Sequence, residues 1–345
     1  MVRVFLILWL AALPALAQSL TGTVEFSVQN LDPDTVSRVE YTPDGKYVYV
    51  FCDLPDGGTR ALVTTNVGLV VSTQAFEEGW IDTIGFSRNG SSGLMLSNYG
   101  REKTWRDFDG RTSRPVEFDP PDFEVQAPFT ILDDSHGRLA TRGSDASADS
   151  SGLYLLKVAG DKIKPELLAR DRDILAELGP PGPLLGFGLS PDFGWCVLSV
   201  AGRKEGELEL FRYNLTRHTG LLVAAATSFL PPAQSRGGYL VFGSRQGEAV
   251  NWQFQNPDGK LAPIELGPGV IGLGVRAFPD QDEFLLTGVQ GSQAYIFKLG
   301  SSTDWTPRQL EVAAPEPPFY LRTGPDGRWL IWTRQGLSFY QLESP

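Results

Sequence analysis

A tight-turn motif that recurs along the chain restricts the fold more than any other feature of the sequence. Its clearest copies, Pro43-Asp44-Gly45 and Pro325-Asp326-Gly327, each lie between two runs rich in aromatic and β-branched residues. Proline fixes φ for the turn, aspartate bonds its own backbone, and glycine supplies a positive φ at no steric cost. Weaker copies lie between these two. The central positions of the successive copies are Asp44, Asn89, His136, Asp192, Arg236, Asp280 and Asp326.

These central positions are 45, 47, 56, 44, 44 and 46 residues apart. A period of about 45 residues is the length of one four-stranded blade of a β-propeller. Each copy also divides into four short runs of Val, Tyr, Phe, Trp and Leu, the composition expected of strands packed between neighbouring blades. We therefore predict an all-β fold, a seven-bladed β-propeller with four-stranded blades.

The last copy of the repeat provides only three strands, over residues 319–323, 328–333 and 337–342. At the other end of the chain, the alternating run Thr21–Gln29 has no blade of its own. We predict that this run is the fourth strand of the last blade, which closes the ring and removes an exposed sheet edge. The alternative is a loose N-terminal extension.

One short helix is predicted over residues 172–178, in the longest interval between two copies. Its apolar residues have helical spacing, Asp171 or Asp173 is expected to cap its start, and Gly179-Pro180 is expected to end it. Two interpretations are open: the helix fills space between two blades, or it covers the mouth of the central channel.

The chain begins with the features of a signal peptide over residues 1–17. They are a basic start, an apolar run at Val4–Leu13 and a small-residue cleavage site that ends at Ala17. We expect the mature chain to begin at Gln18, to have no transmembrane segment and to form a single propeller domain over residues 18–345. The predicted location is the periplasm or the cell exterior.

Charge and cysteine content narrow the range of partners. The chain has 41 acidic and 30 basic residues and a net charge of −11, which disfavours nucleic acid and anionic membranes as partners. An exported chain could pair its two cysteines, Cys52 and Cys196. They fall in strands of blades on opposite sides of the predicted ring, beyond the reach of a disulfide, so we expect two buried free thiols.

No set of catalytic residues is predicted. Nucleophilic catalysis needs a base close to the nucleophile, and the only histidines, His136 and His218, fall in different predicted blades. Zinc is set aside because ligands of the Cys and His type are too few.

Calcium is left open but is not implied. It needs several oxygen ligands from one small region. Asp145 and Asp149 form one acidic loop and Asp53 and Asp56 form another, but neither has the spacing of a known calcium loop. Solvated loop acids are the preferred interpretation, and no cofactor is predicted.

An arginine recurs shortly after the predicted second strand in five of the seven blades. These arginines are Arg101, Arg142, Arg203, Arg245 and Arg334. Each should lie on the face that carries the connections between second and third strands and between successive blades. They are the candidate binding residues, as a partly basic ring at that face. The alternative is that each arginine holds its own turn or the neighbouring blade.

The turns at Pro43-Asp44-Gly45, Pro191-Asp192 and Pro325-Asp326-Gly327 resemble those of WD40-like (PD40) repeats, found in TolB-type propellers and in the propellers of prolyl oligopeptidase-type peptidases. The resemblance implies a scaffold, because TolB-type propellers are protein-binding parts of envelope complexes. We therefore predict an exported, non-enzymatic, monomeric propeller that acts as a protein-interaction scaffold of the bacterial cell envelope. The alternative is a lactonase- or lyase-like propeller enzyme with a cation or carboxylates in the channel.

Overall fold

The structure is a computed structural model. It describes residues 18–26, 35–42, 46–55, 58–65, 70–76, 80–86, 93–99, 102–108, 113–125, 130–133, 138–146, 150–179, 183–190, 194–247, 249–277, 282–291, 293–311, 320–323, 328–333 and 336–342. Most of the recurring turns fall outside these ranges, as does the predicted signal peptide.

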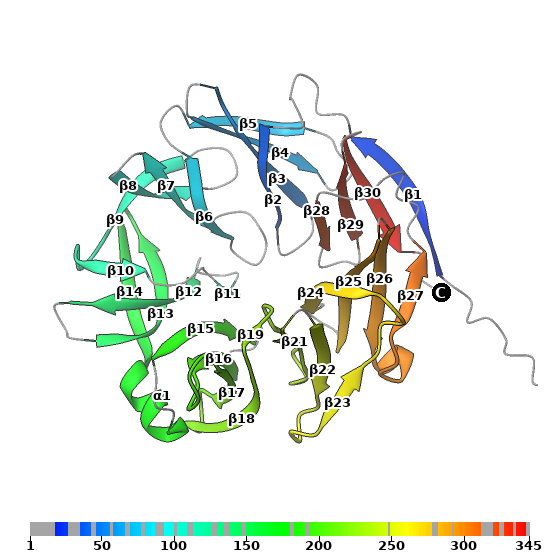
Figure 1. Cartoon of the computed structure of the whole chain (residues 1–345). Helices are drawn as coiled ribbons and strands as arrows, with labels where there is room; N and C mark the ends of the chain where they lie inside the picture. Colours follow the sequence, from blue (N-terminus) through cyan, green and yellow to red (C-terminus); the bar gives the residue numbers. More distant parts are fainter. Residues whose placement is uncertain are drawn as a thin grey trace, which may run out of the picture.

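The described strands are arranged around a common centre, as expected of a β-propeller (Figure 1). One four-stranded sheet consists of β2 (Val36–Tyr41), β3 (Tyr47–Asp53), β4 (Thr59–Thr65) and β5 (Val70–Phe76). Another consists of β15 (Leu184–Leu189), β16 (Trp195–Ala201), β17 (Leu208–Asn214) and β18 (Thr219–Ala226). A third sheet has its first strand in two pieces and contains β19 (Ser228–Phe229), β20 (Ala233–Gln234), β21 (Leu240–Gln246), β22 (Ala249–Gln255) and β23 (Leu261–Ile264).

Two larger sheets arise where outer strands of neighbouring four-stranded groups pair in parallel. The first contains β6 (Trp80–Phe86), β7 (Gly93–Tyr99), β8 (Glu102–Phe108), β9 (Ser113–Phe118), β10 (Phe123–Val125), β11 (Thr130–Asp133), β12 (Arg138–Asp145), β13 (Ser150–Ala159) and β14 (Lys162–Arg170), and its groups meet at the parallel pair of β9 and β14. The second contains β24 (Ile271–Ala277), β25 (Glu283–Gln290), β26 (Gln293–Gly300), β27 (Arg308–Glu311), β1 (Gln18–Phe26), β28 (Tyr320–Thr323), β29 (Arg328–Thr333) and β30 (Gly336–Leu342).

The N-terminal strand β1 lies in the same sheet as the last strands of the chain. It pairs antiparallel with β30 and parallel with β27. It spans Gln18–Phe26 and so begins three residues before the predicted run. The all-β propeller fold is confirmed. The count of seven blades and the closure of the ring stay predictions, because the described strands form five sheets rather than seven.

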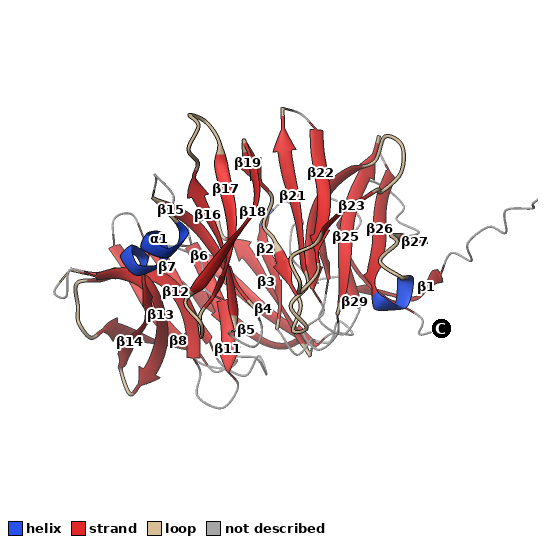
Figure 2. Ribbon diagram, turned by 90° about the horizontal axis from the view of Figure 1, so that it is seen from below, coloured by secondary structure: helices blue, strands red, loops and turns tan. Residues whose placement is uncertain are grey.

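The strands run across the thickness of the ring, so the connections between them lie on its two faces (Figure 2). Within a four-stranded antiparallel group, successive connections alternate between the faces. The connection between second and third strands therefore shares a face with the connection to the next group. We call this the upper face.

Most core residues lie on strands that are buried on both sides. Five consecutive residues of β3, Val48 to Cys52, are buried. Between β21–β23 and β24–β26, Val241, Trp252, Phe284 and Leu286 belong to one apolar cluster. A sheet buried in this way requires a neighbour on each side, which is why the sequence shows continuous apolar runs rather than strict alternation.

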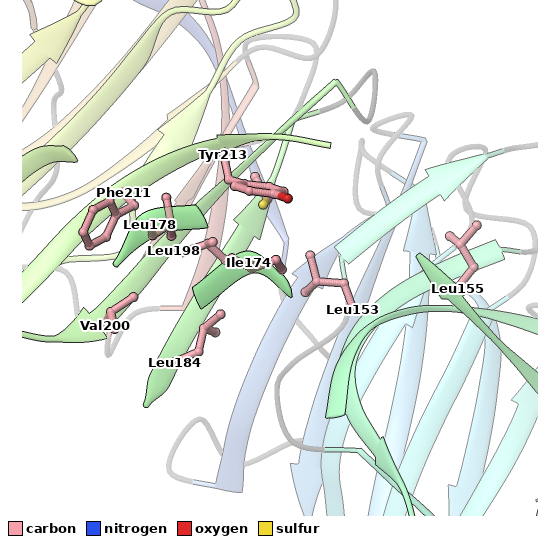
Figure 3. Close-up of a cluster of buried hydrophobic side chains, with 10 residues drawn as sticks. Leu153, Leu155, Ile174, Leu178, Leu184, Leu198, Val200, Phe211 and Tyr213 are labelled. Carbon is pink, nitrogen blue, oxygen red and sulfur yellow. The ribbon is translucent and has the colours of Figure 1, made fainter. Parts of the chain in front are cut away.

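The predicted helix is α1 (Asp171–Leu178), which connects β14 to β15. Ile174 and Leu178 are buried in a cluster with Leu153 from β13 and Tyr213 from β17 (Figure 3). The helix therefore fills space between two blades, and Figure 1 places it away from the centre of the ring.

The start of α1 corrects one expectation. The residue at the N-cap is Arg170, with no hydrogen bond from its side chain, so neither Asp171 nor Asp173 caps the helix. Asp171 is instead the first helical residue, and its carboxylate accepts hydrogen bonds from Arg142. The end is as expected: Gly179 has a φ of 65° and its N–H donates to the carbonyl of Leu175.

Truncating the buried side chain of the helix should destabilise the fold. We expect Ile174→Ala to lower the free energy of unfolding by about 2–5 kcal/mol, because it removes apolar contacts and leaves a cavity. Leu222→Ala, at a half-exposed residue of β18, is the control and should change it by about 0.5 kcal/mol or less. Denaturant unfolding of both variants measures this, and equal effects would contradict the packing role of α1.

Both cysteines are buried free thiols, as predicted. Burial raises the pKa of Cys52 to about 11 and raises that of Cys196 further. A thiol whose pKa is raised on folding stabilises the folded state below the unfolded pKa, and this contribution is lost as pH rises through the folded value. For Cys52 the loss should occur between its ordinary pKa of 9.0 and about 11.

We expect neither thiol to react with iodoacetamide at pH 8 in the folded protein, because the thiolate is the reactive form. Both should react in denaturant, which is the positive control. Mass spectrometry counts the added groups, and rapid labelling of the native protein would contradict the burial of these thiols.

Candidate binding face

The structure describes three of the five candidate arginines, and they have different environments. Arg142 lies in β12, Arg203 follows β16, and Arg245 lies near the end of β21. Arg101 and Arg334 lie outside the described residues.

Arg142 is held in an ion pair that joins β12 to the first residue of α1. Its Nε and Nη2 atoms donate to Oδ2 of Asp171 at 3.2 and 2.6 Å. The two side chains are only 17% and 11% exposed. Because its guanidinium is already bonded, Arg142 fits the alternative interpretation for these arginines, that they hold neighbouring structure together.

A matched pair of variants tests this role. Removing one partner of a buried ion pair leaves an uncompensated charge, so Arg142→Ala should lower the free energy of unfolding by about 3 kcal/mol. Arg114 makes the same two contacts with Asp107, but these side chains are 57% and 22% exposed. Arg114→Ala should cost less than about 1 kcal/mol. Denaturant unfolding compares them, and similar losses would refute the structural role of Arg142.

Arg203 and Arg245 are exposed. The backbone N–H of Arg203 donates to Oε1 of Glu209 at 3.4 Å, which fixes the start of its loop. Arg245 is directly opposite Val250 in the pairing of β21 with β22. Directly opposite residues project on the same side of a sheet, so the Arg245 side chain lies beside that of Val250.

Val250 also lines a pocket of about 350 Å³ on the upper face. The pocket lies where β22 begins and β23 ends, against the connection from β23 to β24. Its lining residues are Val250, Trp252, Ile264, Glu265, Leu266, Gly267, Pro268 and Val270. Six of these eight are apolar residues with side chains, and Glu265 is exposed.

The connection that lines the pocket is held in place from β25 and β26. The Gln290 side chain donates through Nε2 to the carbonyl of Pro268 at 2.9 Å, and Tyr295 donates its hydroxyl to Gln290 Oε1 at 3.0 Å. Gly267 and Gly269 have φ values of 108° and 75°, a conformation that favours glycine. The wall of the pocket is therefore formed before any ligand arrives.

The innermost strands carry exposed apolar side chains near the upper face. Leu185 on β15 and Ile271 and Leu273 on β24 are 54%, 56% and 53% exposed. The pairing register shifts at Leu185 and at Leu273, as in a β-bulge, so each lacks a partner on the next strand. We call Leu185, Ile271 and Leu273 the inner apolar residues.

Sequence reasoning missed both the pocket and the inner apolar residues. The one usable signal in the sequence is a leucine followed by glycine, at Leu185-Gly186 in β15 and at Leu273-Gly274 in β24, since glycine in a strand often marks a bulge. The pocket has no local motif, because its walls come from residues that only the fold brings together.

The described residues provide no group of three or more His, Cys, Asp and Glu side chains that could hold a metal ion. His218 has a φ of 54°, and its Nδ1 atom lies 3.3 Å from the hydroxyl of Tyr213. Burial raises the pKa of Tyr213. His136, Asp56 and Asp149 lie outside the described residues, and the enzyme alternative stays a prediction. No described helix is long and apolar enough to span a membrane.

Solved structures provide the comparison for the fold. The β-propeller domain of Cps50 (Swd1) from Myceliophteria thermophila is similar with a TM-score of 0.54 and 12% identity, covering 90% of this chain and 97% of that one. The chain has a β-propeller fold. TolB from Acinetobacter baumannii is similar with a TM-score of 0.45 and 14% identity, covering 67% of this chain and 55% of that one. No family model and no curated protein matches the sequence.

The comparison confirms, for the fold, the resemblance to WD40-like propellers that the recurring turns carry. At this level of identity it establishes architecture alone, because one propeller fold serves many unrelated functions. Function has to be argued from the upper face itself.

Proposed function

We propose that this protein is an exported protein-interaction scaffold of the bacterial cell envelope and that it binds its partner through the upper face. The inner apolar residues carry the proposal. Soluble proteins place large apolar side chains at the surface in groups mainly where another molecule covers them. Here three of them, each more than half exposed, lie on inner strands near the upper face, and a pocket lies at the connection that leads into β24, the strand that carries two of them.

The charges around this face fit a protein partner. Arg203 and Arg245 are exposed on the upper face of a chain whose net charge is −11. Protein interfaces are enriched in arginine and in apolar anchors, and their polar rims steer association. A rigid propeller that presents such groups at strand ends is suited to hold a partner without rearranging.

The proposal of export rests on residues 1–17. Their basic start, apolar run and small-residue cleavage site are those of a signal peptide. Fractionation of a bacterium that expresses the full chain tests this part. We expect the protein outside the cytoplasm, with the mass of a chain that begins at Gln18. A product that stays in the cytoplasm and keeps residues 1–17 would refute export.

Two triple variants test the binding face. We expect Leu185→Ser, Ile271→Ser and Leu273→Ser together to weaken partner binding at least tenfold, because the apolar contact area is lost. The matched control changes Leu221, Leu222 and Leu261 to Ser, since these residues of the outer strands β18 and β23 are 50%, 46% and 40% exposed.

The measurement starts with capture from envelope extract by residues 18–345, followed by identification of the partner and titration of the purified pair. Circular dichroism checks that both triple variants fold. Equal binding by the two variants, or a larger loss in the control, would overturn the assignment of the upper face. Failure of the parent protein to retain any partner would overturn the scaffold proposal.

A further inference from the structure

The pocket on the upper face is lined mainly by residues with apolar side chains. Six of its eight lining residues are of this kind, and the other two are Gly267 and Glu265. Among the described residues that line it there is no lysine, arginine or histidine, and Arg245, which lies beside Val250, is outside the lining. A molecule held there would therefore meet apolar side chains and a single charged residue, which is acidic.

We propose that this pocket binds a small, mainly apolar organic molecule that carries no negative charge. The apolar body of the molecule packs against the lining side chains, and the carboxylate of Glu265 disfavours an anion. This inference goes beyond the proposed function, which concerns a protein partner, and neither depends on the other.

The size and composition of the pocket suit a small molecule. At about 350 Å³ it lies within the range of small-molecule sites, which is about 300–1,000 Å³. Such sites are lined mainly by hydrophobic and aromatic side chains, with a few polar groups that select the ligand. Here Trp252 is the aromatic residue and Glu265 is the charged one.

Trp252 supplies a fixed aromatic part of the lining. It is 4% exposed and belongs, with Ile264, to the apolar cluster between β21–β23 and β24–β26. A Cβ atom at Gly272 would overlap the indole Nε1 atom, and one at Gly243 would lie 3.2 Å from Cζ2. Glycine at these two positions, on β24 and β21, therefore makes room for the ring. Because Nε1 is buried against β24, the indole offers carbon atoms to the pocket, which favours an apolar ligand.

The connection after β23 supplies another part of the lining and is also fixed. Gln290 donates through Nε2 to the carbonyl of Pro268 at 2.9 Å, and the hydroxyl of Tyr295 donates to Gln290 Oε1 at 3.0 Å. Binding then costs less ordering of the protein, and more of the contact energy is expressed as affinity. A small ligand makes few contacts, so a preformed site of this kind is what it requires.

Glu265 supplies the selection against anions. Its side chain is exposed, so its effect on a bound molecule is modest and is screened by salt. Like charges that meet at a binding site disfavour the mismatched ligand. The selection should therefore be measurable at low ionic strength and should weaken when salt is added.

Two dyes with the same aromatic body provide the probe. N-phenylnaphthylamine is neutral, anilinonaphthalene sulfonate adds a sulfonate to the same rings, and the fluorescence of both rises in apolar surroundings. At low ionic strength we expect residues 18–345 to bind the neutral dye at least about threefold more tightly than the anionic one. Glu265→Gln should lower this preference at least about twofold. Glu205→Gln, which removes an exposed acid on the connection between β16 and β17, is the matched control and should leave the preference unchanged.

Two further variants fill the pocket. Val270→Trp and Val250→Trp each place an indole at a lining residue, and each should weaken binding of the neutral dye at least about tenfold. Leu222→Trp adds the same side chain on the outer strand β18 and should leave dye binding unchanged. Circular dichroism checks that every variant folds, and either filling variant decides the outcome if the other does not fold.

Unchanged dye binding in the folded filling variants would overturn the proposed site, as would a parent protein that binds neither dye. An unchanged preference in Glu265→Gln would overturn the selection against anions. Loss of dye binding in the triple variant of the inner apolar residues, without loss in Val270→Trp, would assign the dye to those residues and overturn the pocket. Partner capture does not depend on dye binding, so the scaffold proposal would stand or fall separately.

Discussion

The packing of apolar side chains on both sides of each sheet is the constraint on which the rest of the structure depends. In β3 the side chains of Val48 and Val50 are completely buried, and the intervening Tyr49, which projects to the other side, is also buried, with 3% of its surface exposed. A strand of this kind is stable only with a sheet on each side of it. The sheets therefore stand around a common centre, and α1 packs Ile174 and Leu178 against β13 and β17 of two neighbouring sheets.

Strand positions could be predicted from the sequence because local turn chemistry determines them. The strands predicted over residues 319–323, 328–333 and 337–342 are β28, β29 and β30, whose bounds differ from the predicted ones by at most one residue. The bounds of the helix were also predicted to within one residue, but the predicted N-cap residue was wrong. The carboxylate of Asp171 is bonded by Arg142, which lies 29 residues earlier, and no local pattern indicates such a partner.

The candidate site was less accessible to sequence reasoning for the same physical reason. The recurrence of the arginines in sequence gave no reason to distinguish one from another. The fold does distinguish them: Arg142 is largely buried in an ion pair, whereas Arg245 is exposed and lies opposite Val250, which lines a pocket. That pocket exists because the connection after β23 packs against β22. These two segments share no sequence motif that could have predicted the contact. Leu273 is similar: its apolar character suggests a core residue, and only the shift in register shows why it is exposed.

The constraint that makes the propeller rigid also decides where binding can occur. Side chains in the middle of the strands pack against neighbouring sheets. Residues can therefore vary without loss of stability only at strand ends, in connections and at the inner edge of the ring. The connection after β23 combines all three, since it runs from a strand end to the inner strand β24 and is fixed by Gln290. Gln290 and Tyr295, which hold this connection in place, belong to β25 and β26. Both strands are already packed in the core, so fixing the connection requires little additional ordering of the chain.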